Sequence, residues 1–288
     1  MILTRRQMTD RIANGMPWLD KAAASLKLVS EPIFGPKGPR AVKDALYGTW
    51  LGHPLHPLVT DLPIGFWTSS LALDLVGNHQ GADLALKAGT ISALGAAATG
   101  VAQWQDLQEL DQPRRLGALH ATMNAAATGL YGVSWYLRSH DLRNAGIACS
   151  TISYGIVMAS SWIGGDLIYR LGIGVSRIAF EETDPEWINV LAESDLMEGE
   201  LTKADARDVS LVLYKKGNDT FAITATCSHL GGPLDQGEVR DGCVVCPWHQ
   251  SEFNLATGKV VHGPATEDAR VFQTRTHEGQ IQVCPAKG

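Results

Sequence analysis

Four apolar stretches dominate the first 180 residues of the chain. They cover residues 57–76, 82–104, 116–137 and 146–169 and are rich in Leu, Ala, Ile, Val and Gly. Each has about 20 residues or more, which at a rise of about 1.5 Å per residue lets a helix cross a hydrocarbon core of about 30 Å. The pattern therefore predicts four long helices.

Two of these stretches lack the polar stripe of a water-facing helix. Residues 88–105 and 116–137 contain no Asp, Glu, Lys or Arg, whereas a helix on the surface of a soluble bundle carries charged side chains on its outer face. Ala, Gly, Ser and Thr recur instead, and small residues let membrane helices pack closely. A soluble four-helix bundle is the alternative, but the pattern favours a four-helix transmembrane bundle.

The pattern changes to short β-type segments in the last third of the chain. Residues 209–214 and 220–226 flank the turn-rich sequence KKGND, which predicts a hairpin. Residues 260–261, 271–274 and 280–283 predict further strands. We expect a small antiparallel all-β domain here.

These segments divide the chain into four parts. We expect an N-terminal helical segment over residues 1–45, the transmembrane domain over 46–175, a linker over 176–185 and the β domain over 186–288. The fold class is α + β multidomain, with a four-helix transmembrane bundle followed by a small antiparallel β domain.

Basic residues predict the orientation of the bundle. Four crossings put both termini on one face, together with Arg114, Arg115 and Arg170, whereas the opposite loops hold only Arg138 and Arg143. Because Lys and Arg gather on the cytoplasmic side, we expect both termini and the β domain in the cytoplasm, with the helices in a bacterial plasma membrane. No segment resembles a cleaved leader.

Four metal-binding side chains lie in the β domain. Cys227 and His229 form C-x-H, and after sixteen residues Cys246 and His249 form C-x-x-H. Two thiolates and two imidazoles can hold a [2Fe–2S] cluster, with the Cys pair on one iron and the His pair on the other. Zinc also accepts Cys2His2, but usually with C-x-x-C and H-x3–5-H spacing. One Cys and one His in each of two loops favour the cluster, and the neighbouring Cys243 reads as a strand residue.

The loops CSHLGGPL (227–234) and CPWHQSEF (246–253) resemble those of the Rieske [2Fe–2S] domain, in its ferredoxin-like subgroup. The resemblance covers roughly residues 186–286 and includes a third turn, GPA (263–265), that could close over the cluster. It implies that the two Cys bind the inner iron and the two His bind the outer, solvent-facing iron. The family resemblance therefore predicts one-electron transfer.

The same resemblance bears on the reduction potential. Respiratory members of the family carry an extra Cys in each loop, and the two form a disulfide; Gly232 and Trp248 stand at those places here. Ser251 matches a Ser that hydrogen-bonds sulfur in high-potential members, but Phe253 replaces their Tyr. Hydrogen bonds to the sulfurs raise the potential, so we expect an intermediate-to-low value.

A second motif, GHPLHP (52–57), opens the first long helix. The text LGHPLHPLVTDLPIGFW, a HATMN in the third helix and GGDLIYRLGIGV after the fourth resemble a family of bacterial four-helix membrane domains of unknown function, over roughly residues 40–180. Because each His precedes a Pro, we expect an extended, polyproline-like segment in which His53 and His56 point the same way.

The predicted topology gathers polar residues near one membrane face. They are His53, His56, Asp61, Gln103, Asp106, His120, Asn124 and Asp166. Polar groups at that depth are costly and usually functional. His53, His56 and His120 could ligate a haem b or a metal ion or contact a quinone; helix capping and interior packing are the structural alternatives.

The favoured function is a membrane-anchored one-electron carrier that contacts lipid and a redox partner protein, either a reductase or a respiratory component. A quinone- or haem-linked oxidoreductase with its own active site in the helices, and a non-enzymatic redox sensor, remain alternatives. The chain has no G-x-G-x-x-G or P-loop motif for a nucleotide cofactor. Its net charge of −6 gives no case for nucleic acid.

Overall fold

The computed structural model describes residues 5–35, 37–181 and 185–286. The chain groups into two compact units, a helical unit (Met1–Pro39 and Leu55–Ile173) and a β unit (Arg40–Pro54 and Gly174–Gly288). This grouping differs from the expected domain boundaries, since residues 40–54 group with the β unit. Residues 182–184 of the expected linker lie outside the described part of the chain.

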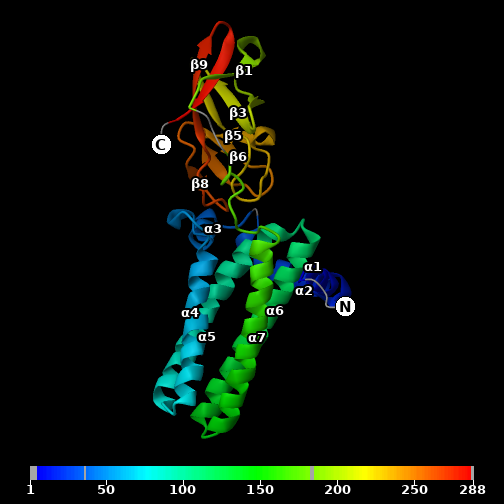
Figure 1. Ribbon diagram of the computed structural model, residues 1–288, viewed down its shortest axis with the longest axis vertical. Helices are drawn as coiled ribbons and strands as arrows, with labels where there is room; N and C mark the ends of the chain where they lie inside the picture. Colours follow the sequence, from blue (N-terminus) through cyan, green and yellow to red (C-terminus); the bar gives the residue numbers. More distant parts are fainter. Residues whose placement is uncertain (1–4, 36, 182–184, 287–288) are drawn as a thin grey trace. The chain divides into compact units, whose positions relative to one another are not determined.

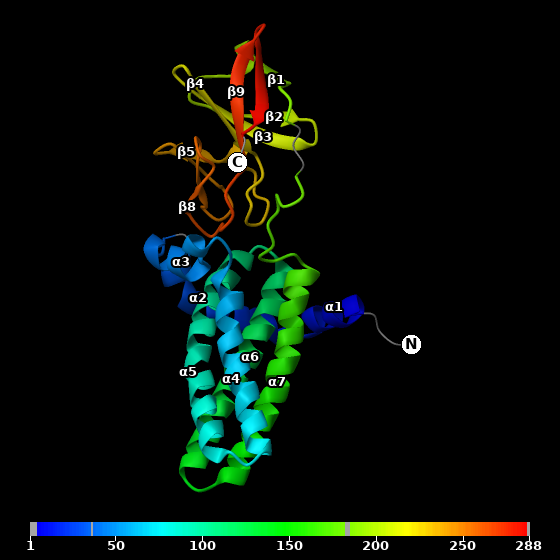
Figure 2. The same cartoon turned by 60° about the vertical axis from the view of Figure 1, so that its left-hand side comes forward.

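Four long helices make up most of the helical unit (Figure 1). They are α4 (Leu55–Leu75), α5 (His79–Trp104), α6 (Asp111–Ser139) and α7 (Arg143–Tyr169). Consecutive helices are antiparallel, and α4 packs mainly on α5 and α6 on α7. The four helices predicted from the apolar stretches are confirmed. Figure 2 shows α1 (Arg5–Gly15) and α2 (Trp18–Phe34) running across the end of the bundle at which α4 begins.

The bundle buries small and hydroxyl side chains beside a few large ones, and it leaves many large apolar side chains exposed. Ser134 and Ser153 are fully buried, whereas Leu94 on α5 and Ile152 on α7 are exposed. The large side chains inside include the stacked rings of Trp67 and Tyr131, whose centroids are 4.1 Å apart. The exposed apolar side chains are unusual for a soluble bundle, because water drives large apolar side chains inward.

Two helical segments are long and apolar enough to cross a membrane: His79–Leu107, which is α5 continued by the short 3-10 helix η2 (Gln105–Leu107), and Arg143–Tyr169. Only 33% of the most apolar window of each is buried, unlike the core helix of a soluble protein. α4 contains Asp61 and Asp74, and α6 contains basic residues near both ends. The four-helix bundle is confirmed as a fold, and two of its helices have the composition of membrane spans.

The β unit contains two antiparallel sheets. The larger sheet has the order β1-β10-β9-β4-β3-β2 and the smaller β5-β6-β7-β8. The strands are β1 (Ile188–Ala192), β2 (Leu201–Ala206), β3 (Val209–Lys216), β4 (Asp219–Thr224), β5 (Glu238–Arg240), β6 (Cys243–Val245), β7 (Glu252–Asn254), β8 (Val260–His262), β9 (Val271–His277) and β10 (Gln280–Pro285). The predicted β3–β4 hairpin and the predicted strands at β8, β9 and β10 are confirmed.

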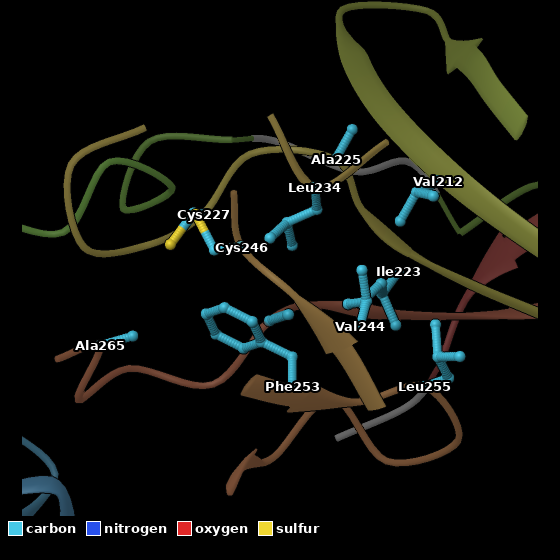
Figure 3. Packing of buried hydrophobic residues seen from close by; sticks show 11 residues of the cluster. Val212, Ile223, Ala225, Cys227, Leu234, Val244, Cys246, Phe253, Leu255 and Ala265 are labelled. Carbon is cyan, nitrogen blue, oxygen red and sulfur yellow. The ribbon is translucent and has the colours of Figure 1, made fainter. Parts of the chain in front are cut away.

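A compact apolar core joins the two sheets (Figure 3). Ile223 of β4, Val244 of β6 and Phe253 of β7 are fully buried in it. Cys227 and Cys246 belong to the same cluster of buried residues, at one end of it. The sheets thus provide a rigid base for the loops that carry the predicted ligands.

Candidate metal centre

The two ligand loops have the same backbone hydrogen-bonding pattern. The Cys227 N–H donates to the Gly232 carbonyl (2.9 Å), and the Gly231 N–H donates back to the Cys227 carbonyl (2.9 Å). In the second loop the Cys246 N–H donates to the Ser251 carbonyl (2.8 Å), and the Gln250 N–H donates back to the Cys246 carbonyl (3.1 Å). Two equivalent turns therefore present one Cys and one His each.

A left-handed residue closes each loop at the same position. It is Gly231 in the first loop (φ 83°) and Gln250 in the second (φ 65°). This backbone conformation suits Gly and is uncommon for other residues. Gly231 therefore makes the first loop tight, as the sequence predicted. Gln250 adopts the same left-handed turn although its side chain makes that conformation less favourable.

The two thiols lie side by side in the core, as Figure 3 shows. The hydrogen bond from Cys227 lowers the pKa of Cys246 to about 7 and raises the pKa of Cys227 well above its ordinary value. Backbone N–H groups of Trp248 and His249 also point at the Cys246 sulfur, and that of His229 points at the Cys227 sulfur. The pocket thus favours a thiolate at Cys246.

The two imidazoles form the other half of the site. The rings of His229 and His249 are 5.1 Å apart between centroids and nearly perpendicular. Burial, with smaller contributions from His249 and Arg177, lowers the pKa of His229 to about 3. The neutral ring, which is the form that binds a metal, is therefore strongly favoured at His229.

These residues fit the ligand demand of a binuclear iron–sulfur cluster. A [2Fe–2S] cluster of this kind needs only two protein ligands per iron. The thiol pair and the imidazole pair match that need, and the N–H groups around sulfur match the charge of the cluster.

Comparison with known proteins identifies the kind of centre. A family model, described as the Rieske [2Fe-2S] domain, matches residues 186–274. The anthranilate 1,2-dioxygenase ferredoxin subunit of Burkholderia cepacia is 35% identical over 103 residues, which make up 36% of this chain and 95% of that protein. The chain belongs to the Rieske [2Fe–2S] family. Its Rieske domain implies a [2Fe–2S] cluster and electron transfer.

Further comparisons match each of the two domains. The 3-phenylpropionate/cinnamic acid dioxygenase ferredoxin subunit of Escherichia coli O139:H28 is 33% identical over 31% of this chain and 85% of that protein. The solved complex of reduced oxygenase and oxidized ferredoxin in carbazole 1,9a-dioxygenase aligns with 28% identity and a TM-score of 0.34, over 36% of this chain and 98% of that one. Residues 52–177 match a second family model, described as predicted membrane protein (DUF2231).

Gly232 tests how tightly the Rieske loops are packed. A Cβ added there would lie 2.7 Å from the Cys246 sulfur and 3.2 Å from Trp248, so Gly232→Ala should lower the iron content of the purified chain several-fold. Gly129→Ala is the control, because its added Cβ meets nothing within 4 Å. Optical absorbance and iron analysis measure the effect; a Gly232→Ala variant with full iron content would contradict this packing.

The predicted histidine site in the helices is only partly assembled. His56 lies inside α4, which begins at Leu55, so the expected extended segment with His53 and His56 pointing the same way is wrong. Pro57 is tolerated at the third helical position because N–H groups in the first turn have no helical partner. His53 is exposed and groups with the β unit, whereas His56 and His120 group with the helical unit.

Hydrogen bonds fix the rings of His56 and His120. The His56 Nδ1 lies 3.1 Å from the Thr99 hydroxyl. The His120 Nδ1 lies 2.9 Å from the Ser160 carbonyl, and its Nε2 lies 3.1 Å from the amide nitrogen of Asn124. Because the amide donates to Nε2, that atom does not face a haem iron in this arrangement. The residues therefore do not fit the predicted haem.

Asp166 and Asp61 of the predicted polar set differ in their surroundings. Asp166 is buried and accepts a 2.7 Å hydrogen bond from Arg170 Nε. Asp61 is exposed on α4. Of the predicted polar set, the structure brings Asn124 against His120 and leaves Asp166 in a local ion pair.

An ion network at the far end of the bundle was not predicted. The guanidinium of Arg138 on α6 bonds Asp74 of α4 at 2.6 Å and Asp83 of α5 at 3.1 Å, and Arg143 of α7 also bonds Asp83 at 2.6 Å. The side chains of Arg138 and Asp74 are only 2% and 3% exposed. The network therefore joins all four helices. The sequence signal that could have revealed this network is the presence of Asp74, Asp83, Arg138 and Arg143 near the ends of otherwise apolar helices.

Proposed function

We propose that the chain is a membrane-bound one-electron carrier whose cluster is held by Cys227, Cys246, His229 and His249. The observation that carries this proposal is the pair of equivalent loops, which bring two thiols and two imidazoles to one end of a buried core. The cluster supplies a reversible one-electron couple. The chain's own residues hold it, donate N–H groups to its sulfur ligands and keep the His229 imidazole neutral.

Electrons would enter and leave at the imidazole edge. Trp248, next to His249, is 56% exposed, and the two rings lie 6.4 Å apart between centroids. An exposed aromatic side chain beside the ligand suits a transient protein–protein contact. Since the relatives are named as ferredoxin components of dioxygenase systems, we propose a reductase or another redox protein as the partner.

Reduction by a reductase tests the carrier function. The purified full-length chain should accept one electron per cluster from a ferredoxin reductase and NADH, and return it to an oxidised acceptor such as cytochrome c, without a small-molecule substrate. His249→Ala should abolish both half-reactions. Turnover that continues in His249→Ala would contradict the carrier function.

Ser251 gives a test of the cluster environment. Its side chain hydrogen-bonds the Cys227 sulfur, and such bonds raise the potential of a cluster. Loss of one hydrogen bond of about 1 kcal/mol corresponds to roughly 50 mV in a one-electron couple. Ser251→Ala should therefore lower the potential by roughly 50 mV in a redox titration.

We expect the reduction potential of the unmodified chain in the lower part of the Rieske range of about −150 to +300 mV. A potential near the upper limit would contradict this.

We propose further that all four long helices cross the bacterial plasma membrane, with both termini and the Rieske domain in the cytoplasm. Support comes from the outward-facing Leu94 and Ile152, the small and hydroxyl interior, and the basic residues at Arg114 and Arg115. The chain should stay in the membrane pellet after carbonate washing. Protease added to right-side-out vesicles should leave the β unit intact, and its cleavage there would reverse the orientation.

A quinone site in the helical unit is the second candidate. One observation favours it: His56 of α4 and His120 of α6 are close enough to interact electrostatically, and each ring is held by a hydroxyl-bearing residue. A quinone carbonyl accepts hydrogen bonds of the kind that the His56 imidazole can donate. Quinone-dependent oxidation of the reduced cluster that is lost in His56→Ala would support this site. The redox-sensor alternative stays a prediction.

A further inference from the structure

A short segment before the membrane bundle forms part of the Rieske unit. Residues 40–54, which we call the strap, comprise α3 (Arg40–Tyr47), the 3-10 helix η1 (Thr49–Leu51) and the residues up to Pro54. The strap lies outside both matched families, which cover residues 186–274 and 52–177, except for its last three residues. By sequence it is separated from the β strands by the whole bundle.

The strap contacts the loop that follows β8. One carboxylate oxygen of Asp44 lies 2.7 Å from the His262 Nδ1, and the other accepts the Gly263 N–H at 2.9 Å. Arg40 pairs with Glu252, whose side chain is buried. The third contact is steric: a Cβ on Gly263 would lie 2.6 Å from the Thr49 hydroxyl oxygen.

The same loop continues to the proposed cluster ligands. Ala265 is buried in the core cluster that contains both thiols (Figure 3). Its N–H donates to the Ser251 hydroxyl oxygen at 2.9 Å, and the Ser251 side chain hydrogen-bonds the Cys227 sulfur. A continuous path therefore runs from Asp44 through Gly263 and Ala265 to a ligand sulfur.

We propose that the strap holds the 262–265 loop in place over the cluster site, and that Asp44 is a positioning residue for the Ser251 hydrogen bond to sulfur. Asp44 acts by accepting two hydrogen bonds from the loop at once, which fixes both the side chain of His262 and the backbone of Gly263. Without these bonds the loop keeps only the pairing of His262 with Glu252 in the sheet, the Ala265 N–H bond to Ser251 and the apolar packing of Ala265. The inference rests on the proposed ligand set.

Hydrogen exchange and redox titration of the full-length, cluster-loaded chain in detergent test the strap. Asp44→Asn removes the negative charge of the carboxylate that accepts the two bonds, and Asp219→Asn, at the exposed first residue of β4, makes the same change away from the site. We expect amide exchange in residues 262–266 to rise tenfold or more in Asp44→Asn and to stay unchanged in Asp219→Asn. Arg40→Ala breaks a more exposed contact and should give a smaller increase, so it replaces Asp44→Asn if that variant fails to fold.

A double-variant comparison separates positioning from general stability. Asp44→Asn should lower the potential in the same direction as Ser251→Ala, and should add nothing in a Ser251→Ala background. Unchanged exchange in residues 262–266, or potential shifts that simply add, would overturn the proposal. A chain that lacks a Rieske signal altogether would instead overturn the ligand set, and the exchange result would still report on the strap.

Discussion

Replacing Cys246 by Ser should remove the iron–sulfur centre from the purified chain, whereas replacing Cys243 by Ser should leave it in place. The two residues are three positions apart and both are buried. Only Cys246 lies in a ligand loop beside Cys227. A Ser hydroxyl does not replace the soft thiolate that iron–sulfur clusters require. Iron should fall from about two atoms per chain to near zero in Cys246→Ser only.

The pair is informative because it controls for general damage to the β unit. Cys243 sits in β6 and pairs across the sheet with Asn254 and Arg240, so Cys243→Ser perturbs the same region. Equal iron loss in both variants would mean that the loss reflects unfolding. Retention of iron in Cys246→Ser would mean that the ligand set is wrong.

Replacing Arg138 by Ala should strongly destabilise the helical unit. Its guanidinium bonds two carboxylates and the hydroxyls of Ser134 and Ser150. Its removal leaves the buried Asp74 without its main partner, and breaking a buried ion pair in this way costs about 3–5 kcal/mol. Thermal unfolding of the helices in detergent, followed by circular dichroism, should show the loss as a lower Tm.

Arg143→Ala is the matched control for this effect. Arg143 also bonds Asp83, but its side chain is 28% exposed, and an exposed ion pair contributes about 1 kcal/mol at most. The cluster signal should survive in both variants, since the network belongs to the helical unit. Equal Tm losses in the two variants would contradict a special role for the buried Arg138–Asp74 pair.

The ligand loops could be predicted from the sequence because the residues that define each loop are neighbours in the chain. Each turn closes within six residues, from Cys227 to Gly232 and from Cys246 to Ser251, so each Cys and its neighbouring His can be recognised together in the sequence. The β3–β4 hairpin was equally predictable from its turn sequence. The four helices followed from apolar stretches longer than any strand.

The strap could not be predicted, because its contacts join distant parts of the chain. Asp44 and His262 are 218 positions apart, and α3 reads as an ordinary polar helix. Hydrophobic patterning also missed β1 and β2, which lie at the two edges of the larger sheet. Edge strands bury fewer side chains, so their alternation is weak.

The helix start at Leu55 was missed for a different reason. The His-Pro pairs suggested an extended segment, but a Pro in the first turn is compatible with a helix. As a consequence His56 joins α4 and bonds Thr99, while His53 groups with the β unit. The preference of a residue before Pro for an extended conformation therefore did not decide the structure of His56, which is helical and packs with α4 against α5.

Electron paramagnetic resonance of the full-length chain in its membrane fraction tests the central claim most directly. After reduction with dithionite, we predict a signal of the Rieske type, with an average g value below that of all-Cys [2Fe–2S] clusters because imidazoles bind one iron. The signal should account for one cluster per chain and disappear in Cys246→Ser. A signal of the all-Cys type, or iron-free protein containing zinc, would contradict the account.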